Sequence, residues 1–391
     1  MTLACPACRG AQTTDFLDLG DVPVFCNVQW PSRAQARSVA TGPLSLTACT
    51  ACGHVFNRAF DASRLAYAPG YENSQHASSV FRAYAERLVD RLILTYGVRG
   101  RAVVDIGCGR GDLLALLCER GGNRGYGFDP SFSGTVQQEG ERTWTIQREY
   151  FGATQAAAIR PALVSCRHVL EHVEDPVAFL SGLREAIEAA GDPVLYLEVP
   201  SGEELLEAQG LWDYLYEHVS YFTAQSLEAV LHAAGFEVLS MQRDFGGQFL
   251  CTEARSARGS LVAQSKRTRT EDQLHRAAAA MVERLDAWKQ WAGRLDSAHG
   301  EVSLWGAGSK GVMFLNLLGL SAPQRLARVV DQNTDKHGRF VSGTGQEIIG
   351  PQALRGGNVV EIVLMNGIYQ SEVAAQLKDL GVRARLTVAW P

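Results

Sequence analysis

The chain has 391 residues, of which 46% are hydrophobic and 20% charged, and its formal net charge is −5. This length predicts two or three domains, and the lack of a basic tract disfavours a nucleic-acid partner, because phosphate binding needs clustered Lys and Arg. The sequence shows neither an apolar run of membrane-spanning length nor a signal peptide, so we expect no membrane association and a cytoplasmic location. Its nine cysteines would then be reduced.

Two CxxC pairs lie near the start of the chain. Cys5 and Cys8 form the first pair, and Cys49 and Cys52 form the second. Each pair can place two thiolates on one ion, and four thiolates complete the closed shell of a structural Zn²⁺ site. A redox role is disfavoured, because neither pair lies in a βαβ context. We therefore predict that residues 1–65 form a small, β-rich zinc-binding domain whose core depends on the metal.

Residues 66–84 form an aromatic and polar stretch before a helix that is expected to run to about Leu94. The stretch is too polar for a core and too aromatic for a linker. We expect it to lie at an active site, with Tyr71 and His76 as candidate catalytic residues. The alternative is a surface loop whose tyrosines pack on the zinc-binding domain.

The most informative stretch covers residues 102–113, where a β-branched run is followed by closely spaced glycines and then a leucine-rich helical pattern. This order predicts a buried strand, a tight turn and a helix. Asp129 follows about twenty residues later, where it can accept both hydroxyls of a ribose. The pattern resembles the S-adenosylmethionine (SAM) site of class I methyltransferases. The resemblance assigns cofactor binding to Asp105, Gly107, Cys108, Gly109, Gly111, Asp129 and Pro130.

Further strands are predicted at residues 144–148, 162–166 and 193–200, and the last two strands at 236–241 and 248–252. Helical patterns alternate with them, and the final strand is expected to be antiparallel. We therefore predict a Rossmann-like α/β domain over residues 66–257.

The strand predicted at residues 162–166 leads into a segment that contains the letters H-x-x-E-H, at His168, Glu171 and His172. Zinc peptidases carry such a pattern on a helix. We reject that interpretation, because the letters fall at a strand-to-loop junction and Pro176 is expected to prevent a long helix. In methyltransferases this junction passes beneath the methionine end of SAM. Arg167 and His168 are therefore candidate cofactor contacts, and His172 either faces the acceptor or is a structural histidine.

A second polar and aromatic segment lies at residues 211–223, and Thr223 is expected to cap a helix over 224–234. Within this segment, Glu217 and His218 are a candidate acid–base pair, and a salt-bridged surface pair is the alternative. Residues 258–300 have apolar side chains at helical spacing and predict an amphipathic linker helix that packs between domains.

The last ninety residues begin a second α/β pattern. A strand over 302–305 leads into a glycine turn, and a second strand ends at Asp331. The letters resemble a dinucleotide fingerprint, but Lys310 lies inside the turn and only about four strands are expected. The turn could hold the pyrophosphate of a nucleotide-activated substrate, serve structure alone, or bind NAD. We favour the first use, with substrate contacts from Gly306, Gly308, Ser309, Lys310 and Asp331.

The whole pattern is similar to the sugar C-methyltransferases of deoxysugar biosynthesis. That family joins a four-cysteine zinc domain, a SAM domain and a C-terminal Rossmann-like domain (here 301–391) in this order. The resemblance implies an enzyme that uses SAM and structural Zn²⁺ and methylates the carbon next to the keto group of a dTDP-4-keto-6-deoxysugar.

This chemistry requires a base and a group that stabilises an enolate. His218 fits the base, and Glu217 would orient it or hold a substrate hydroxyl. Tyr216 or Tyr221 would donate to the enolate oxygen, and Tyr71, His76 and His172 would complete the site.

Two stretches depart from the pattern expected of this family, at residues 71–76 and 365–372. Both lie where an acceptor would bind. Another small-molecule acceptor, methylated on carbon, oxygen or nitrogen, therefore remains an alternative. An NAD- or nucleotide-binding protein that uses the C-terminal turn is less favoured.

Overall fold

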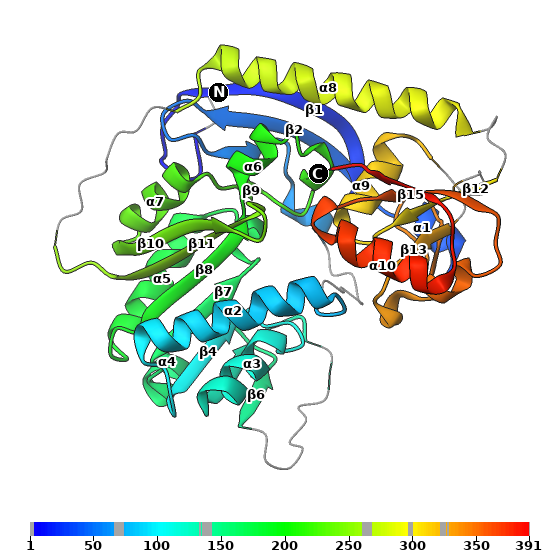
Figure 1. Cartoon of the computed structure of the whole chain (residues 1–391). Helices are drawn as coiled ribbons and strands as arrows, with labels where there is room; N and C mark the ends of the chain where they lie inside the picture. The colour runs from blue at the N-terminus through cyan, green and yellow to red at the C-terminus, as the bar shows by residue number, and fades with distance from the viewer. Residues whose placement is uncertain are drawn as a thin grey trace.

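The computed structural model describes residues 4–65, 74–132, 134, 143–259, 268–295, 300–320, 326 and 328–390. These residues form three β-sheets, and helix α8 (Glu271–Gly293) runs along one side of the molecule (Figure 1). No helix among them is long and apolar enough to cross a membrane. Tyr71, one of the candidate catalytic residues, lies outside the described residues.

The N-terminal sheet has the strand order β1-β2-β3-β9. Its first three strands are β1 (Thr13–Pro23), β2 (Thr41–Cys49) and β3 (Val55–Asn57), with α1 (Arg33–Arg37) after β1 and the short helix η1 (Ala62–Leu65) after β3. The fourth strand, β9 (Ser220–Tyr221), pairs antiparallel with β3 and comes from the segment that follows His218. The N-terminal sheet is therefore completed by a piece of chain from far beyond residue 65.

The central sheet has seven strands in the order β10-β11-β8-β7-β4-β5-β6. Strand β11 is antiparallel to both β8 and β10, and the other pairs are parallel. This confirms the predicted α/β fold and the antiparallel last strand. Its strands are β4 (Ala102–Ile106), β5 (Arg124–Phe128), β6 (Trp144–Gln147), β7 (Leu163–Arg167), β8 (Val194–Pro200), β10 (Phe236–Asp244) and β11 (Phe249–Ser256).

Helices cover both faces of the central sheet. α2 (Ser79–Tyr96) and α3 (Asp112–Gly121) pack together on one face (Figure 1). A second group of helices is held together by α5 (Pro176–Glu188), which packs against both α4 (Ala153–Ile159) and α7 (Ala224–Ala233). The short helices η2 (Leu170–His172), α6 (Gly202–Glu207) and η3 (Leu211–Asp213) lie in the connections.

Pro176 acts differently from our expectation. It does not end a helix but begins α5, where Asp175 caps the first turn. Proline is tolerated at this position because the first-turn N–H would have no intrahelical partner. The H-x-x-E-H letters nevertheless lie outside a long helix, as predicted, because η2 spans only three residues.

The C-terminal sheet has five strands in the order β14-β13-β12-β15-β16, all parallel. It contains one strand more than the four expected. The strands are β12 (Glu301–Trp305), β13 (Arg328–Val330), β14 (Glu347–Ile349), β15 (Val359–Leu364) and β16 (Arg385–Val388). The helices are α9 (Ser309–Leu317), η5 (Thr334–Lys336), η6 (Pro351–Leu354), η7 (Gly367–Tyr369) and α10 (Gln370–Leu380).

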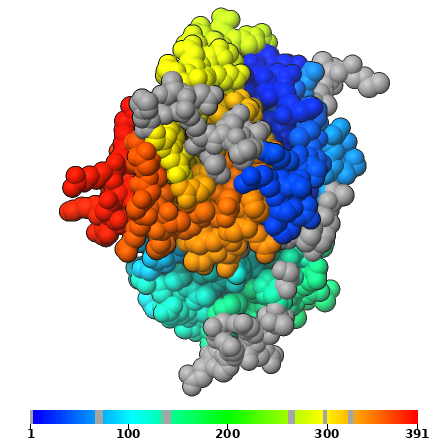
Figure 2. All heavy atoms as spheres, turned by 90° about the vertical axis from the view of Figure 1, so that its right-hand side faces the viewer, coloured from blue at the N-terminus to red at the C-terminus, as the bar shows by residue number. Residues whose placement is uncertain are grey.

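The N-terminal sheet, helix α8 and the C-terminal sheet share one core cluster, whereas the strands of the central sheet contribute to other clusters. Leu274, Met281 and Leu285 of α8 are buried in a cluster that also contains side chains of the N-terminal and C-terminal sheets. This confirms the predicted amphipathic helix between domains. Residues near α1 also join the C-terminal unit, since Trp30 forms a β-bridge with Phe340. Figure 2 shows the N-terminal part lying directly beside the C-terminal unit.

Candidate functional site

The glycine turn after β4 packs closely against the protein and contacts the acid that follows β5. Gly107 has φ +66°, and a Cβ added there would lie 2.2 Å from Val169 Cγ2, so a larger residue would be strained and would clash. The Gly109 N–H donates to Asp129 Oδ2 (2.8 Å), and the Ser131 N–H and hydroxyl both donate to Oδ1. Asp129 therefore lies at the end of β5, beside the turn, as the ribose-binding acid is expected to lie.

Asp105 lies beneath this turn. It is buried, and its carboxylate accepts a hydrogen bond from the Ser165 hydroxyl (2.6 Å). Burial raises the pKa of Asp105 to about 6, although the Ser165 hydrogen bond and Arg167 oppose this shift. Cys108 is partly buried against Gly127, and Pro130 is exposed next to Asp129.

Arg167 and His168 both bind Glu198, a fully buried carboxylate on β8. Arg167 Nη2 donates to Glu198 Oε1 (2.7 Å), and His168 Nε2 lies 3.0 Å from the same oxygen. Burial alone would lower the pKa of His168, but hydrogen bonds with Glu171 and Glu198 outweigh it and raise this pKa to about 9. His168 also has a left-handed backbone, with φ +53°, a conformation that is strained for a non-glycine residue.

Three sequence-predicted residues meet close to this junction. The His172 and His218 rings are 4.8 Å apart and nearly perpendicular. His172 Nδ1 lies 2.9 Å from the Glu217 carbonyl oxygen, so the last residue of η2 holds the His218 loop in place. Burial, together with the nearby His172, lowers the pKa of His218 to about 3. The imidazole of His218 is therefore neutral at physiological pH.

Glu217 does not face His218 in the way we expected. Its Oε2 accepts a hydrogen bond from the Cys26 N–H (2.8 Å), so its carboxylate holds the backbone after β1. Burial raises the pKa of Glu217 to about 7, despite this hydrogen bond and one from the Asn27 backbone. Glu217 thus ties the segment that carries His218 to the N-terminal domain.

The two candidate enolate donors are also used within the protein. The Tyr221 hydroxyl donates to the Leu215 carbonyl and accepts from the Leu215 N–H. The Tyr216 hydroxyl donates to the Asp61 carbonyl and accepts from the Asp61 N–H. Both side chains are almost completely buried. They therefore fix the loop rather than present a phenol to a substrate.

His76 is half-buried at the start of α2, with its ring packed edge-on against Phe81. Burial lowers its pKa. The neighbouring Ser74 hydroxyl donates to Asp112, the first residue of α3 (2.9 Å). The segment before α2 therefore lies beside the glycine turn, and its place in an active site stays a prediction.

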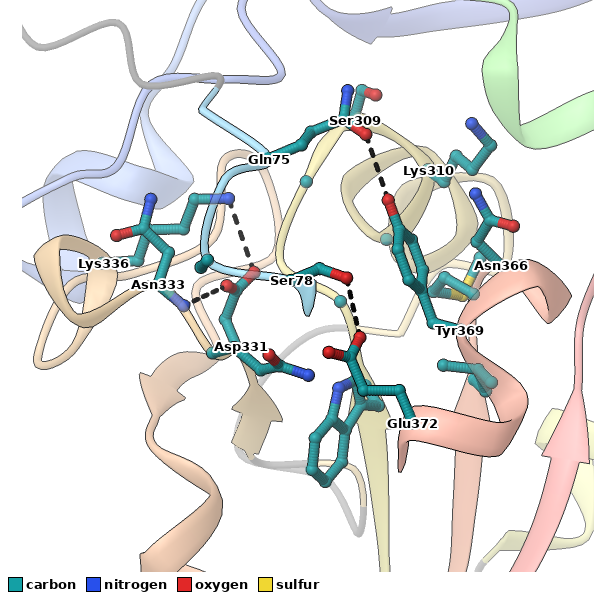
Figure 3. A pocket seen from close by; sticks show the side chains of 18 of the residues that line it. Gln75, Ser78, Ser309, Lys310, Asp331, Asn333, Lys336, Asn366, Tyr369 and Glu372 are labelled. Carbon is teal, nitrogen blue, oxygen red and sulfur yellow. Dashed lines mark hydrogen bonds and ion pairs between the residues drawn. The ribbon is translucent and has the colours of Figure 1, made fainter. Parts of the chain in front are cut away.

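A pocket lies between this segment and the carboxyl edge of the C-terminal sheet (Figure 3). Asp331 at the end of β13 accepts hydrogen bonds from the Ala307 and Asn333 N–H groups, and Lys336 lies 3.4 Å from it. Gly306, Gly308 and Ser309 line the same pocket. The pocket is also lined by Gln75 and Ser78 from the stretch 66–84 and by Asn366, Tyr369 and Glu372 from the stretch 365–372. Asn333 and Lys336, which line it too, were not indicated by the sequence.

Lys310 contributes to the pocket wall, but its ammonium is bound elsewhere. It forms an ion pair with Asp213 of η3 (3.0 Å) and lies over the Trp390 ring. Glu372 accepts hydrogen bonds from Ser78 and Ser79 at the start of α2. These contacts connect the C-terminal unit to both segments that flank the central site.

The four N-terminal cysteines form one cluster. Cys5 and Cys52 sulfurs lie 3.7 Å apart, and Cys8 and Cys49 sulfurs 3.6 Å apart. Four thiolates at about 2.3 Å from one Zn²⁺ have sulfur–sulfur distances of about 3.8 Å, so the cluster fits such an ion. Cys26 and His54, which could also ligate a metal, are not part of this cluster.

Comparison with known proteins identifies two domains in the chain. A methyltransferase domain matches residues 76–241, and a C-methyltransferase C-terminal domain matches residues 252–389. The chain is 24% identical to the C-methyltransferase NovU of Streptomyces niveus over 394 residues, which cover 96% of this chain and 92% of NovU. The two domain matches identify the protein as a methyltransferase that carries a C-methyltransferase C-terminal domain.

Two further similarities cover only part of the chain. A tRNA U34 carboxymethyltransferase from Dichelobacter nodosus is 29% identical over 128 residues, 30% of this chain and 38% of that protein. The structure of magnesium protoporphyrin IX methyltransferase from Synechocystis PCC 6803, with bound SAH, is 21% identical. It covers 49% of this chain and 91% of its own, with a TM-score of 0.35.

Proposed function

We propose that the enzyme methylates the carbon next to the keto group of a nucleotide-activated 4-keto-deoxysugar, with a dTDP-sugar as the acceptor. The observation that carries this proposal is the position of the C-terminal pocket. The pocket is lined by a glycine turn of the nucleotide-binding type, by Asp331, which accepts a hydrogen bond from that turn, and by Ser74. The Ser74 hydroxyl also donates to Asp112, the first residue of α3, which directly follows the turn proposed to hold SAM. A nucleotide held there would direct its sugar toward the central site.

The residues of the central site support proton abstraction. A neutral imidazole is a suitable base for a proton next to a ketone, and burial keeps His218 neutral. His172 braces the His218 loop through the Glu217 carbonyl. Bound SAM supplies an electrophilic methyl group. The protein contributes mainly by aligning the deprotonated carbon with that methyl, since correct orientation alone can supply a large part of the rate enhancement.

The glycine turn, Asp105 and Asp129 are proposed to hold SAM. The clash that a Cβ at Gly107 would make shows how closely the turn packs, and the Asp129 carboxylate is fixed by the Gly109 N–H. Arg167 and His168 are proposed to support the methionine end of SAM from the carboxyl end of β7. His76 and, outside the described residues, Tyr71 are proposed to line the acceptor side.

We also propose that Cys5, Cys8, Cys49 and Cys52 bind a structural Zn²⁺ ion, and that the enzyme is cytoplasmic, where thiols stay reduced. The N-terminal sheet pairs with β9, and the buried His54 lies 3.1 Å from the Ser220 hydroxyl on that strand. The ion would therefore stabilise the strand that directly follows His218.

Hydrogen–deuterium exchange tests the function without needing methyl transfer. The enzyme, saturated with S-adenosylhomocysteine (SAH) in D₂O, is mixed with a dTDP-4-keto-6-deoxysugar, and exchange of the proton next to the ketone is followed by NMR. We expect exchange with wild type, loss of exchange in His218→Ala, and a product heavier by one methylene when SAM replaces SAH. Methyl transfer to an oxygen or nitrogen, or normal exchange in His218→Ala, would overturn the proposal.

A further inference from the structure

One buried carboxylate in the central site has no role in the function described above. Glu171 lies in η2 and is 1% exposed. Its one close partner is the His168 ring, whose Nδ1 forms an ion pair with Oε1 at 3.5 Å, and the other oxygen, Oε2, accepts no hydrogen bond from the described residues. A buried carboxylate is costly unless neighbouring groups compensate it. A buried carboxylate of this kind in a candidate active site therefore suggests a functional role.

The neighbours of Glu171 are the two histidines of the site. One carboxylate oxygen of Glu171 and one ring nitrogen from each of His172 and His218 all lie within 4.8 Å of one another. His218 Nδ1 is buried and has no hydrogen-bond partner among the described residues. His172 Nδ1 is already engaged with the Glu217 carbonyl. Glu171 Oε2 and His218 Nδ1 are thus two buried polar atoms without a hydrogen-bond partner among the described residues, on side chains that lie close together.

Glu217 cannot serve as the carboxylate partner of His218 in this arrangement. Its Oε2 is held by the Cys26 N–H, on the side of the N-terminal domain. A histidine base needs a partner that fixes its ring orientation and stabilises the imidazolium once the proton has been taken. Glu171 is the carboxylate whose position permits this.

We propose that Glu171 is the positioning residue for the His218 base: it orients the His218 ring and stabilises the imidazolium formed when His218 takes the proton next to the ketone. This inference rests on the proposed role of His218. In the proton-transfer step, the carbon–hydrogen bond breaks, its electron pair becomes the enolate, and the proton moves to a His218 ring nitrogen. The negative charge of Glu171 then faces the new positive charge.

The charges around His218 are consistent with this role. His172 and His168 face it from the end of β7 and η2, Asp213 from η3, and Tyr221 from β9. Glu171 and Asp213 raise the pKa of His218, whereas burial and the two other histidines lower it. Burial opposes the ionisation of Glu171, but the hydrogen bond from His168 and the nearby imidazoles keep its pKa below the ordinary range. Glu171 therefore remains an anion when His218 is neutral.

The test compares Glu171→Gln with Glu217→Gln and with Glu185→Gln, an exposed position on α5. His218 is observed directly by NMR of the ¹⁵N-histidine-labelled enzyme with SAH, and its signal is assigned with His218→Asn. We expect Glu171→Gln to lower the pKa of His218 by about one unit and to slow deuterium exchange about tenfold, because one pKa unit is a tenfold change in proton affinity. Glu217→Gln should leave the His218 pKa within about 0.3 unit.

The outcomes separate this proposal from the proposed function. Exchange that is lost in His218→Ala but normal in Glu171→Gln, with an unchanged His218 pKa, would overturn the role of Glu171 and keep the base. Exchange that survives in His218→Ala would overturn the base itself.

Glu171→Asp is included as a second variant in case Glu171→Gln does not fold. It keeps the charge and should recover part of the exchange rate. Metal analysis by mass spectrometry completes the test. A second ion in each chain that Glu171→Gln removes would overturn the proposal, because Glu171, His172 and His218 would then be ligands.

Discussion

Two glycine turns have the same pattern of backbone hydrogen bonds: the turn after β4, proposed to hold SAM and here called the SAM turn, and the turn after β12, here called the C-terminal turn. In the SAM turn, the Gly107 N–H donates to Phe128 O, and the Gly109 N–H donates to Asp129. In the C-terminal turn, the Gly306 N–H donates to Val330 O, and the Ala307 N–H donates to Asp331. In both turns a second N–H, two residues after the acid, binds its other oxygen.

The turns differ in the cations around them. Asp331 forms an ion pair with Lys336, and the helix that opens at the C-terminal turn carries Lys310, whose ammonium binds Asp213. The cation of the SAM turn, Arg110, binds Asp335 of the C-terminal unit. SAM carries a positive sulfonium, whereas a nucleoside diphosphate is an anion. The difference in cations fits the proposed assignment of SAM to the first turn and of a nucleoside diphosphate to the second, because ammonium groups beside the acid favour an anionic ligand.

Replacing Asp129 or Asp331 with alanine tests the proposed difference in ligand between the two turns most strongly. We expect Asp129→Ala to weaken SAH binding about 100-fold and to leave dTDP affinity nearly unchanged, since several hydrogen bonds to a charged group are lost together. Asp331→Ala should do the reverse. Calorimetry with each ligand measures both effects. If Asp331→Ala weakened SAH binding and not dTDP binding, the C-terminal turn would not be a nucleotide site.

Glu217 tests how the segment between the turns is held. Its pKa in the folded protein, about 7, lies above the ordinary value of 4.5. Its contribution to stability is therefore fully present below pH 4.5 and is lost as the pH rises through 7. Between pH 5 and 8, wild type should lose about 2 kcal/mol relative to Glu217→Gln. Urea denaturation across this range measures the difference, and parallel stability curves would contradict it.

Lys336 tests the charge difference between the turns. Its side chain is 6% exposed beside Asp331. We expect Lys336→Met to weaken dTDP binding about tenfold, because a buried cation next to the ligand is removed, and to leave SAH binding unchanged. Lys378→Met, at an exposed position on α10, is the control. Equal dTDP affinities in the two variants would show that Lys336 serves only Asp331.

Lys310 should have the smallest effect, and on a different quantity. Because its ammonium binds Asp213 ahead of the His218 segment, we expect Lys310→Met to lower kcat about fivefold with little change in dTDP affinity. Steady-state kinetics with a dTDP-4-keto-6-deoxysugar, together with calorimetry, separates the two quantities. A loss of dTDP affinity at constant kcat would instead assign Lys310 to substrate binding.

Much of the fold could be predicted because it depends on local patterns. The strand of residues 102–106, the glycine turn and the helix cap at Thr223 all have clear local signals. Strands β9 and β14 could not be predicted. They contain two and three residues, which is too few for a period of two to be visible, and their pairing depends on distant parts of the chain.

The candidate site shows the same limit. The sequence indicates that Glu217 and His218 matter, but adjacent residues in a loop can point in opposite directions, and only the tertiary structure shows that Glu217 binds the Cys26 backbone. The letters H-x-x-E-H drew attention to Glu171 for a metal chemistry that we rejected. Its closeness to His218 arises from two segments that are far apart in the sequence.

The pairing of β3 with β9 has a consequence for biosynthesis. His54 and Ser220, which meet at this pairing, are 166 positions apart. During translation, β3 remains an unpaired edge strand of the N-terminal sheet until residue 221 has left the ribosome. An exposed edge strand is a site of aggregation. Production of the N-terminal domain alone, or grafting it onto another methyltransferase, should therefore succeed only when residues 211–223 are transferred with it.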